Sequence, residues 1–198
     1  MKIKSLFLLA ALAVFAAFKP AVQTETFTID TQRSSIEWVG SKVTGKHNGT
    51  VKLSSGSLAF SGQKLQGGSF TTDMTTLKVL DLQGEYAQKL EGHLKNDDFF
   101  GVEKFPTSAF NITRVTMKGK DQATITGNLT IKGITHPVTF PAVVKRQGNA
   151  VVAVAKGVKI DRTKYDVKYG SNSIFGGLGD KAIDDEFILD INLAGKKS

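Results

Sequence analysis

Three histidines are the first residues to consider for chemistry, because the 198-residue chain contains no cysteine. His47, His93 and His136 lie far apart, and none occurs in a His-Glu-x-x-His spacing that would place two metal ligands on one helix face. The chain also lacks the Gly-x-Ser-x-Gly turn that presents a nucleophilic serine. We therefore expect no catalytic residue, no metal site and no enzymatic activity, with His93 as the single candidate for an acid or base.

Two acidic clusters, Asp97-Asp98 and Asp184-Asp185-Glu186, offer oxygen ligands of the kind that calcium prefers. Adjacent carboxylates on a strand point to opposite faces and converge only where a loop wraps around the ion. We interpret both clusters as solvated turns.

Two adjacent aromatic residues, Phe99 and Phe100, directly follow the polar residues Asn96, Asp97 and Asp98. Burying each ring is worth about 2–3 kcal/mol, enough to hold a loop against its entropy. We expect both rings to turn inward beside Leu94. The spacing leaves two roles open for them, lining a cavity or plugging a core.

The elements that must position these residues are short alternating strands. In residues 123–131 one face carries Ala123, Ile125, Gly127, Leu129 and Ile131, which is the period of a half-buried strand. The same pattern predicts seven further strands at residues 35–43, 50–60, 65–74, 105–115, 138–145, 150–160 and 187–195. The fold class is therefore all-β and antiparallel.

Eight strands with one apolar face each either close into a barrel or stack as a sandwich. The interior glycines Gly67, Gly68 and Gly127 suit the bends of a closing sheet, and consecutive strands are near in sequence. This favours the barrel, with the sandwich as the alternative.

One segment departs from the strand pattern. Leu82, Tyr86, Leu90 and Leu94 recur every four residues, which predicts an amphipathic helix over residues 82–94. Its apolar stripe needs a partner, and the open end of a barrel provides one. We expect a short capping helix with Tyr86 and Leu90 buried.

The N-terminus and the charge indicate an exported protein. Two lysines precede an apolar run at residues 6–18, shorter than the roughly 20 residues of a membrane span, so residues 1–17 are predicted to be a signal peptide and no stable membrane span is expected after cleavage. The formal net charge of +8 comes from lysines scattered singly, without the basic and aromatic clusters of nucleic-acid-binding proteins. We expect a periplasmic or secreted protein that does not bind nucleic acid.

Three stretches resemble a known family. The sequences GHLKNDDFFGVEKFPTSAFNIT, ITGNLTIKGITHPVTFPAVV and IDDEFILDINLAG are similar to those of the YceI family of exported, polyisoprenoid-binding, lipocalin-like proteins. The resemblance covers residues 27–194. It implies an extended eight-stranded antiparallel lipocalin-like barrel whose apolar tunnel holds an isoprenoid or fatty chain.

The resemblance and the strand pattern together give a candidate site. The predicted apolar cavity residues are Trp38, Phe70, Tyr86, Leu90, Leu94, Phe99, Phe100, Phe110, Ile125, Leu129 and Phe140. Four residues are candidates for contacting a polar head group, namely Lys42, His93, Lys95 and Arg162.

The predicted function is to bind, carry or sequester a long-chain isoprenoid, another long-chain lipid or a quinone without catalysis. No cofactor is expected beyond the bound isoprenoid or fatty-chain lipid, and a homodimer is left open. The alternative is a structural or interaction barrel of the cell envelope whose core is filled by its own side chains.

Overall fold

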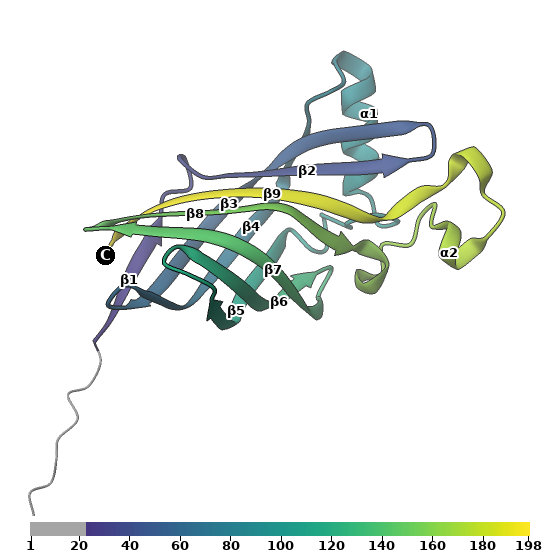
Figure 1. The fold of residues 1–198 in the computed structure, drawn as a ribbon. Helices are drawn as coiled ribbons and strands as arrows, with labels where there is room; N and C mark the ends of the chain where they lie inside the picture. Colours follow the sequence, from purple (N-terminus) through teal and green to yellow (C-terminus); the bar gives the residue numbers. More distant parts are fainter. Residues whose placement is uncertain (1–22) are drawn as a thin grey trace, which may run out of the picture.

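Nine strands form a single antiparallel sheet that closes on itself in the computed structural model, which describes residues 23–198 (Figure 1). The strands are β1 (Thr24–Ile29), β2 (Ser35–Lys42), β3 (Gly45–Ser61), β4 (Lys64–Val79), β5 (Thr107–Met117), β6 (Gln122–Ile131), β7 (Ile134–Gln147), β8 (Ala150–Asp161) and β9 (Ile183–Lys197). Each pairs with its neighbour in the chain from β2 to β8, β8 pairs with β9 and β9 with β2. The barrel is confirmed and the sandwich is wrong; the predicted signal peptide lies outside the described residues.

Nine strands occupy eight positions because β1 and β2 share one of them. Both pair with β3 and with β9, β1 at one end of these strands and β2 at the other. Between them, the Asp30 side chain accepts hydrogen bonds from the backbone N–H groups of Gln32 (3.0 Å) and Arg33 (3.2 Å). This turn breaks one long strand into two, and β1 was not predicted from the sequence.

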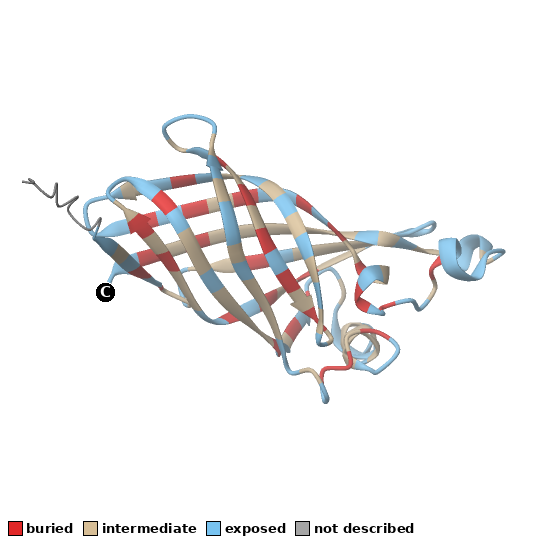
Figure 2. Ribbon diagram, turned by 90° about the horizontal axis from the view of Figure 1, so that it is seen from below, coloured by how far each residue is buried: buried red, intermediate tan, exposed pale blue. Residues whose placement is uncertain are grey.

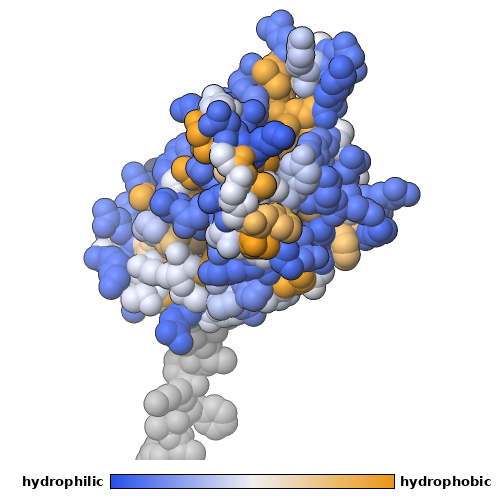
Figure 3. All heavy atoms as spheres, turned by 90° about the vertical axis from the view of Figure 1, so that its right-hand side faces the viewer, coloured by the Kyte–Doolittle hydropathy of each residue, from blue (hydrophilic) through white to orange (hydrophobic). Residues whose placement is uncertain are grey.

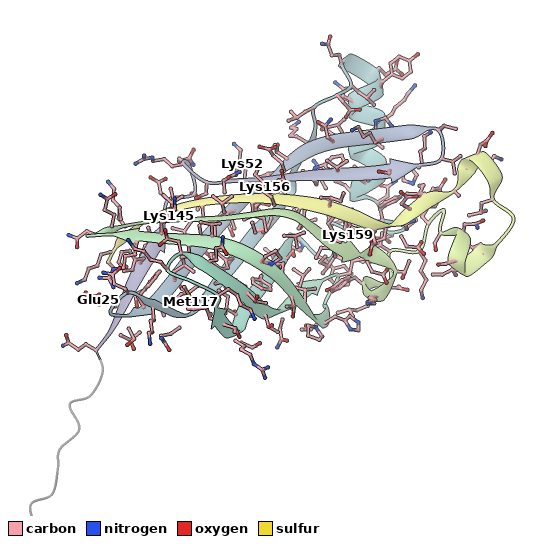
Figure 4. All side chains as sticks on the ribbon, in the orientation of Figure 1. Glu25, Lys52, Met117, Lys145, Lys156 and Lys159 are labelled. Atoms are coloured by element: carbon pink, nitrogen blue, oxygen red, sulfur yellow. The ribbon has the colours of Figure 1, made fainter. Side chains whose placement is uncertain are left out.

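Apolar side chains alternate with polar ones along every long strand, so the interior of the barrel is apolar. All five inward residues predicted in β6 are buried, and bands of buried and exposed positions follow one another around the barrel (Figure 2). Lysines such as Lys52, Lys145 and Lys156 point outward from the wall (Figure 4). The sheet therefore has an apolar inner face and a polar outer face, as the two-residue alternation of the sequence requires.

The end of the barrel near the two described termini is plugged. The rings of Phe27 and Phe60 pack edge to face with centroids 5.1 Å apart, and the Arg146 guanidinium lies 4.8 Å from the centre of the Phe27 ring. Arg146 and Lys197 both bind the carboxylate of Glu25. Hydrogen bonds from Lys197 and Arg146 lower the pKa of Glu25 from its ordinary value, which keeps this carboxylate charged against the two cations.

The longer connections lie at the opposite end. They contain α1 (Gly84–Lys95), the short helix α2 (Asn172–Phe175) and the 3-10 turns η1 (Arg162–Tyr165) and η2 (Gly179–Lys181). The β2–β3 hairpin and the α2 segment project together beyond the sheet (Figure 1). In the described part of the chain, no helix is both long and apolar enough to cross a bilayer.

Helix α1 matches the predicted helix within two residues at its start, but only its second half packs on the barrel. Glu91 accepts hydrogen bonds from Lys78 Nζ (3.2 Å) and the Val79 backbone N–H (3.0 Å), which join the helix to the end of β4. Tyr86 is 76% exposed, so its predicted burial is wrong. Leu90, also predicted to be buried, is only half-buried. A four-residue step overshoots a helical turn by about 40°, which carries Tyr86 away from the face of α1 that packs on the barrel.

Replacing Gly127 tests how closely the side chains pack inside the barrel. A Cβ atom at this position would lie 2.6 Å from Phe110 Cε2 and from the Asn111 carbonyl oxygen, whereas a Cβ at Gly67 would meet nothing within 4 Å. We expect Gly127→Ala to lower the free energy of unfolding by about 1–3 kcal/mol and Gly67→Ala to change it by less than about 1 kcal/mol. Urea unfolding measures both changes, and equal effects would contradict the inference that close packing requires glycine at position 127.

Candidate functional site

An apolar cavity of about 400 Å³ occupies the interior of the barrel. Side chains from β2 through β9 and from α1 line it. Along β9 the lining extends from Ile183 to Leu193, ten residues apart, which corresponds to roughly 33 Å of strand at about 3.3 Å per residue. Residues along most of β9 thus line the cavity, and the side chains of the barrel leave space between them.

Most of the predicted apolar residues lie on the wall of this cavity. Those that line it are Trp38, Phe70, Leu90, Leu94, Phe99, Phe100, Phe110, Ile125, Leu129 and Phe140. Tyr86 does not, because it stands on the free half of α1. Contact of these side chains with a ligand stays a prediction.

Phe99 and Phe100 both face the cavity from the loop after α1, but they differ in burial. Phe99 is 7% exposed and packs edge to face on His93, with centroids 5.1 Å apart. Phe100 is half-buried and approaches Phe187 of β9 at 6.2 Å. Phe99 therefore holds the loop in place, while Phe100 offers more of its ring to the cavity.

The indole of Trp38 needs the absence of a side chain on the neighbouring strand. Trp38 of β2 pairs with Gly49 of β3, and a Cβ atom at Gly49 would lie 1.8 Å from the Lys78 carbonyl oxygen and 2.5 Å from Trp38 Cζ2. Gly49 thereby gives the large ring a place on the cavity wall. In both places a glycine on one strand leaves room for an aromatic ring of the neighbouring strand, Gly49 for Trp38 and Gly127 for Phe110.

The charged groups of the lining gather at the end opposite the plug. They include Lys42, His47, His93, Asp184 and Glu186. His93 Nε2 lies 3.2 Å from Asp98 Oδ2, and His47 Nδ1 lies 2.8 Å from Asp81 Oδ2. Burial would raise the pKa of Asp81, but hydrogen bonds from the Asn48 N–H and from His47 outweigh it and lower this pKa. The cavity is therefore polar at one end only.

Two of the four head-group candidates have their donors engaged by the backbone. Lys95 does not line the cavity, and its Nζ donates to the Thr75 carbonyl oxygen at 2.9 Å. Arg162 does line the cavity but is only 3% exposed. Lys42 and His93 remain on the wall of the open end, and contact of any of the four with a head group stays a prediction.

Arg162 fastens the rim of the barrel. Its guanidinium donates to four backbone carbonyl oxygens at 2.7–3.0 Å, those of Val167, Tyr169, Ile183 and Asp184. Burial lowers the pKa of Arg162, and the nearby carboxylates of Asp185, Asp161 and Asp184 oppose this change. These bonds fix the loop after β8 to the start of β9, which is the segment that carries Phe187.

Sequence reasoning missed several residues of the open end, among them His47, Tyr169 and Phe187. The rings of Tyr169 and His93 lie 4.6 Å apart, and His47 and Phe187 line the cavity. Phe187 occupies an inward position of the alternating pattern in β9, so the sequence did contain a signal for it. His47 and Tyr169 carried none. The prediction that Asp184, Asp185 and Glu186 form a solvated turn is wrong, because they belong to the start of β9 and Asp184 and Glu186 line the cavity.

The arrangement suits binding of an apolar chain better than bond-making chemistry. Within residues 23–198, no three His, Asp or Glu side chains lie together as a metal site would require. Two of the charged groups at the open end, His47 and His93, each lie against a carboxylate, that of Asp81 and that of Asp98. Such a site offers burial to a ligand tail and polar contacts to one end of it.

Comparison with curated proteins finds relatives of about half of the chain. The chain is 40% identical over 91 residues to a UPF0312 protein of Pseudomonas paraeruginosa, covering 41% of this chain and 47% of that protein. It is 33% identical over 101 residues to a UPF0312 protein of Pseudomonas putida, covering 51% and 50%. The matched part thus spans about half the length of these curated relatives.

Solved structures share the fold. Burkholderia cenocepacia BcnA superimposes with a TM-score of 0.69 at 21% identity, covering 84% of this chain and 98% of that one. A polyisoprenoid-binding domain from Saccharophagus degradans, described as implicated in plant cell wall breakdown, gives 0.62 at 14% identity, covering 87% and 98%. The sequence model of the YceI-like domain matches residues 27–194, and this chain therefore belongs to the family of YceI-like domain proteins.

Proposed function

We propose that the protein holds a long-chain isoprenoid or a similar amphiphilic lipid in its barrel and carries or sequesters it. The observation that carries this proposal is the apolar cavity of about 400 Å³ with charged groups at one end only. This volume falls within the roughly 300–1,000 Å³ of small-molecule sites. The family and the polyisoprenoid-binding domain with the same fold support the ligand class.

The energetics favour an apolar tail over a compact polar ligand. Each buried CH₂ group contributes about 0.8 kcal/mol, so a long chain binds tightly without any charged contact. The wall offers it rings such as Phe110 and Phe140, whose centroids lie 5.5 Å apart. The head group then meets the end where Lys42 and His93 lie.

We propose that the protein acts without catalysis, in the periplasm or after secretion. The first part rests on the lack of convergent acids and bases at the apolar wall among the described residues. The second rests on the predicted signal peptide at residues 1–17. A quinone is an alternative ligand, because it combines a prenyl tail with a polar ring.

Lipid extraction tests the proposal directly. We expect protein purified without detergent from bacterial cells to yield about one long-chain lipid per barrel by native mass spectrometry and organic extraction. The extracted lipid should keep its mass after long incubation with the protein. A barrel without a co-purifying lipid would contradict the binding role, and a changed lipid mass would contradict the absence of catalysis.

Filling the cavity should displace the lipid. Ala142 of β7 lines the cavity, while the next residue, Val143, is 38% exposed on the outer face. We expect Ala142→Phe to lower the lipid content per folded molecule several-fold, because the new ring occupies space that the tail needs. Val143→Phe is the matched control and should retain the lipid. Equal lipid content in both variants would place the ligand elsewhere.

Single alanine substitutions of Phe99 and Phe100 should affect folding stability and lipid retention differently. Phe99→Ala removes a buried ring that packs on His93 and should cost about 3–5 kcal/mol of folding free energy. Phe100→Ala should cost less and reduce lipid retention more, because its half-buried ring faces the cavity. Thermal unfolding of delipidated protein and the mass of extracted lipid measure the two effects. The reverse pattern would show that Phe100 is a packing residue.

A further inference from the structure

The exposed apolar side chains of this protein are concentrated at the open end of the barrel. Among residues 23–198, eight large hydrophobic residues are exposed. Two of them, Val143 and Val152, lie on the outer wall of β7 and β8. The other six lie in the connections of the open end, namely Val43, Leu80, Tyr86, Tyr169, Ile174 and Phe175. Exposed apolar groups are unremarkable when scattered, but a concentration around the mouth of a cavity indicates an interaction surface.

Two projecting segments form the part of this surface that we call the mouth tips, residues 42–46 of the β2–β3 hairpin and residues 172–182 around α2. They lie side by side, because the Val43 backbone N–H donates to the Ala182 carbonyl oxygen at 3.2 Å. Val43 is 63% exposed and Phe175 is 62% exposed. Figure 3 looks onto this end of the molecule and shows hydrophobic atoms among hydrophilic ones.

The mouth tips also carry unneutralised positive charge. They contain Lys42, Lys46 and Lys181 against a single acid, Asp180. Among the ion pairs of the described residues, none involves these three lysines. An apolar side chain flanked by lysines matches the boundary between acyl chains and anionic head groups, because the lysines reach phosphate while the apolar group enters the acyl layer.

We propose that the mouth tips dock the open end of the barrel on an anionic phospholipid bilayer. The inference rests on the proposed function, since a long-chain lipid avoids water only if the mouth meets the membrane directly. A second copy of the chain fits less well, because a two-fold interface would bring the unpaired lysines of one copy's mouth tips against those of the other, and like charges repel. Docking places Val43 and Phe175 in the acyl layer and Lys42 and Lys46 among the phosphates.

Vesicle binding tests this proposal with matched variants. The probe is vesicles of equimolar phosphatidylcholine and phosphatidylglycerol, and all variants share the same N-terminus so that residues 1–22 contribute equally. We expect Val43→Ser with Phe175→Ser to weaken binding about tenfold or more, and the control pair Val143→Ser with Val152→Ser to leave it unchanged. Equal loss in both pairs, or no loss in either, would overturn the proposal.

A second pair of variants tests the charge. Lys42→Gln with Lys46→Gln should weaken binding about fivefold per lysine at low salt, the equivalent of about 1 kcal/mol each, and should have no effect on pure phosphatidylcholine vesicles. Lys120 lies in the turn between β5 and β6, and Lys145 lies on the wall of β7, away from the mouth (Figure 4). Their replacement by Gln is the control, and an equal loss there would show attraction by net charge alone.

Two outcomes separate this inference from the proposed function. Protein that retains lipid but shows no vesicle binding above that of the mouth-tip variants would overturn docking and leave lipid binding intact. Protein that binds vesicles through the mouth tips but never yields lipid would overturn lipid binding and leave docking intact. A dimer in solution that dissociates on Val43→Ser with Phe175→Ser would show that the mouth tips contact a second copy, and would also overturn docking.

Discussion

The pairing of β4 with β3 is the interaction on which the rest of the structure depends, because it turns an open sheet into a tube. Their register runs from Gly49 opposite Val79 to Ser61 opposite Lys64. Closure removes both sheet edges and gives every inward side chain the same lumen to fill. An eight-stranded barrel is just wide enough either for side chains to fill it or for one ligand. Small inward residues such as Ala142, Ala153 and Ala155 decide the outcome here, since they leave the space that larger residues would occupy.

The two ends of the barrel are built differently, one from packed side chains and the other from loops. One is sealed by Phe27, Phe60 and the stacked guanidinium of Arg146. The other is framed by loops that Arg162 ties together through backbone carbonyl groups. Both ends use a nearly buried arginine, but Arg146 neutralises a carboxylate while Arg162 satisfies backbone oxygens. The tube is thus closed at one end, and the rim that Arg162 holds together is the route that the proposed function assigns to the lipid.

The strands were readable from the sequence because each side chain's face is fixed by a period of two. Residues 123–131 show this best, since all their predicted inward positions are buried. The first strand, Thr24–Ile29, was missed because it offers only Phe27 and Ile29 as inward positions. That β1 and β2 occupy one barrel position depends on pairing with Gly195–Lys197, a contact between the two ends of the chain that no local pattern contains.

Cavity residues on regular strands could be predicted from the sequence, whereas the positions of side chains on α1 and in the loops could not. Phe110 and Phe140 followed from alternation. Tyr86 was misplaced because a four-residue spacing drifts around a helix, and Lys95 because its side chain turns to the Thr75 carbonyl. Arg162 was predicted only as a cation that contacts a head group. Its burial depends on carbonyl groups up to 22 residues away in the chain, and their approach is a property of the folded loop.

Electron density inside the barrel is the most direct test of the central claim that this closed tube holds an amphiphilic lipid. The measurement is a crystal structure of protein purified without detergent and without delipidation. We expect continuous elongated density along the cavity, with its polar end near Lys42 and His93 and its tail beside Phe110 and Phe140. A cavity that contains only ordered water, or that has collapsed as these rings move inward, would contradict it.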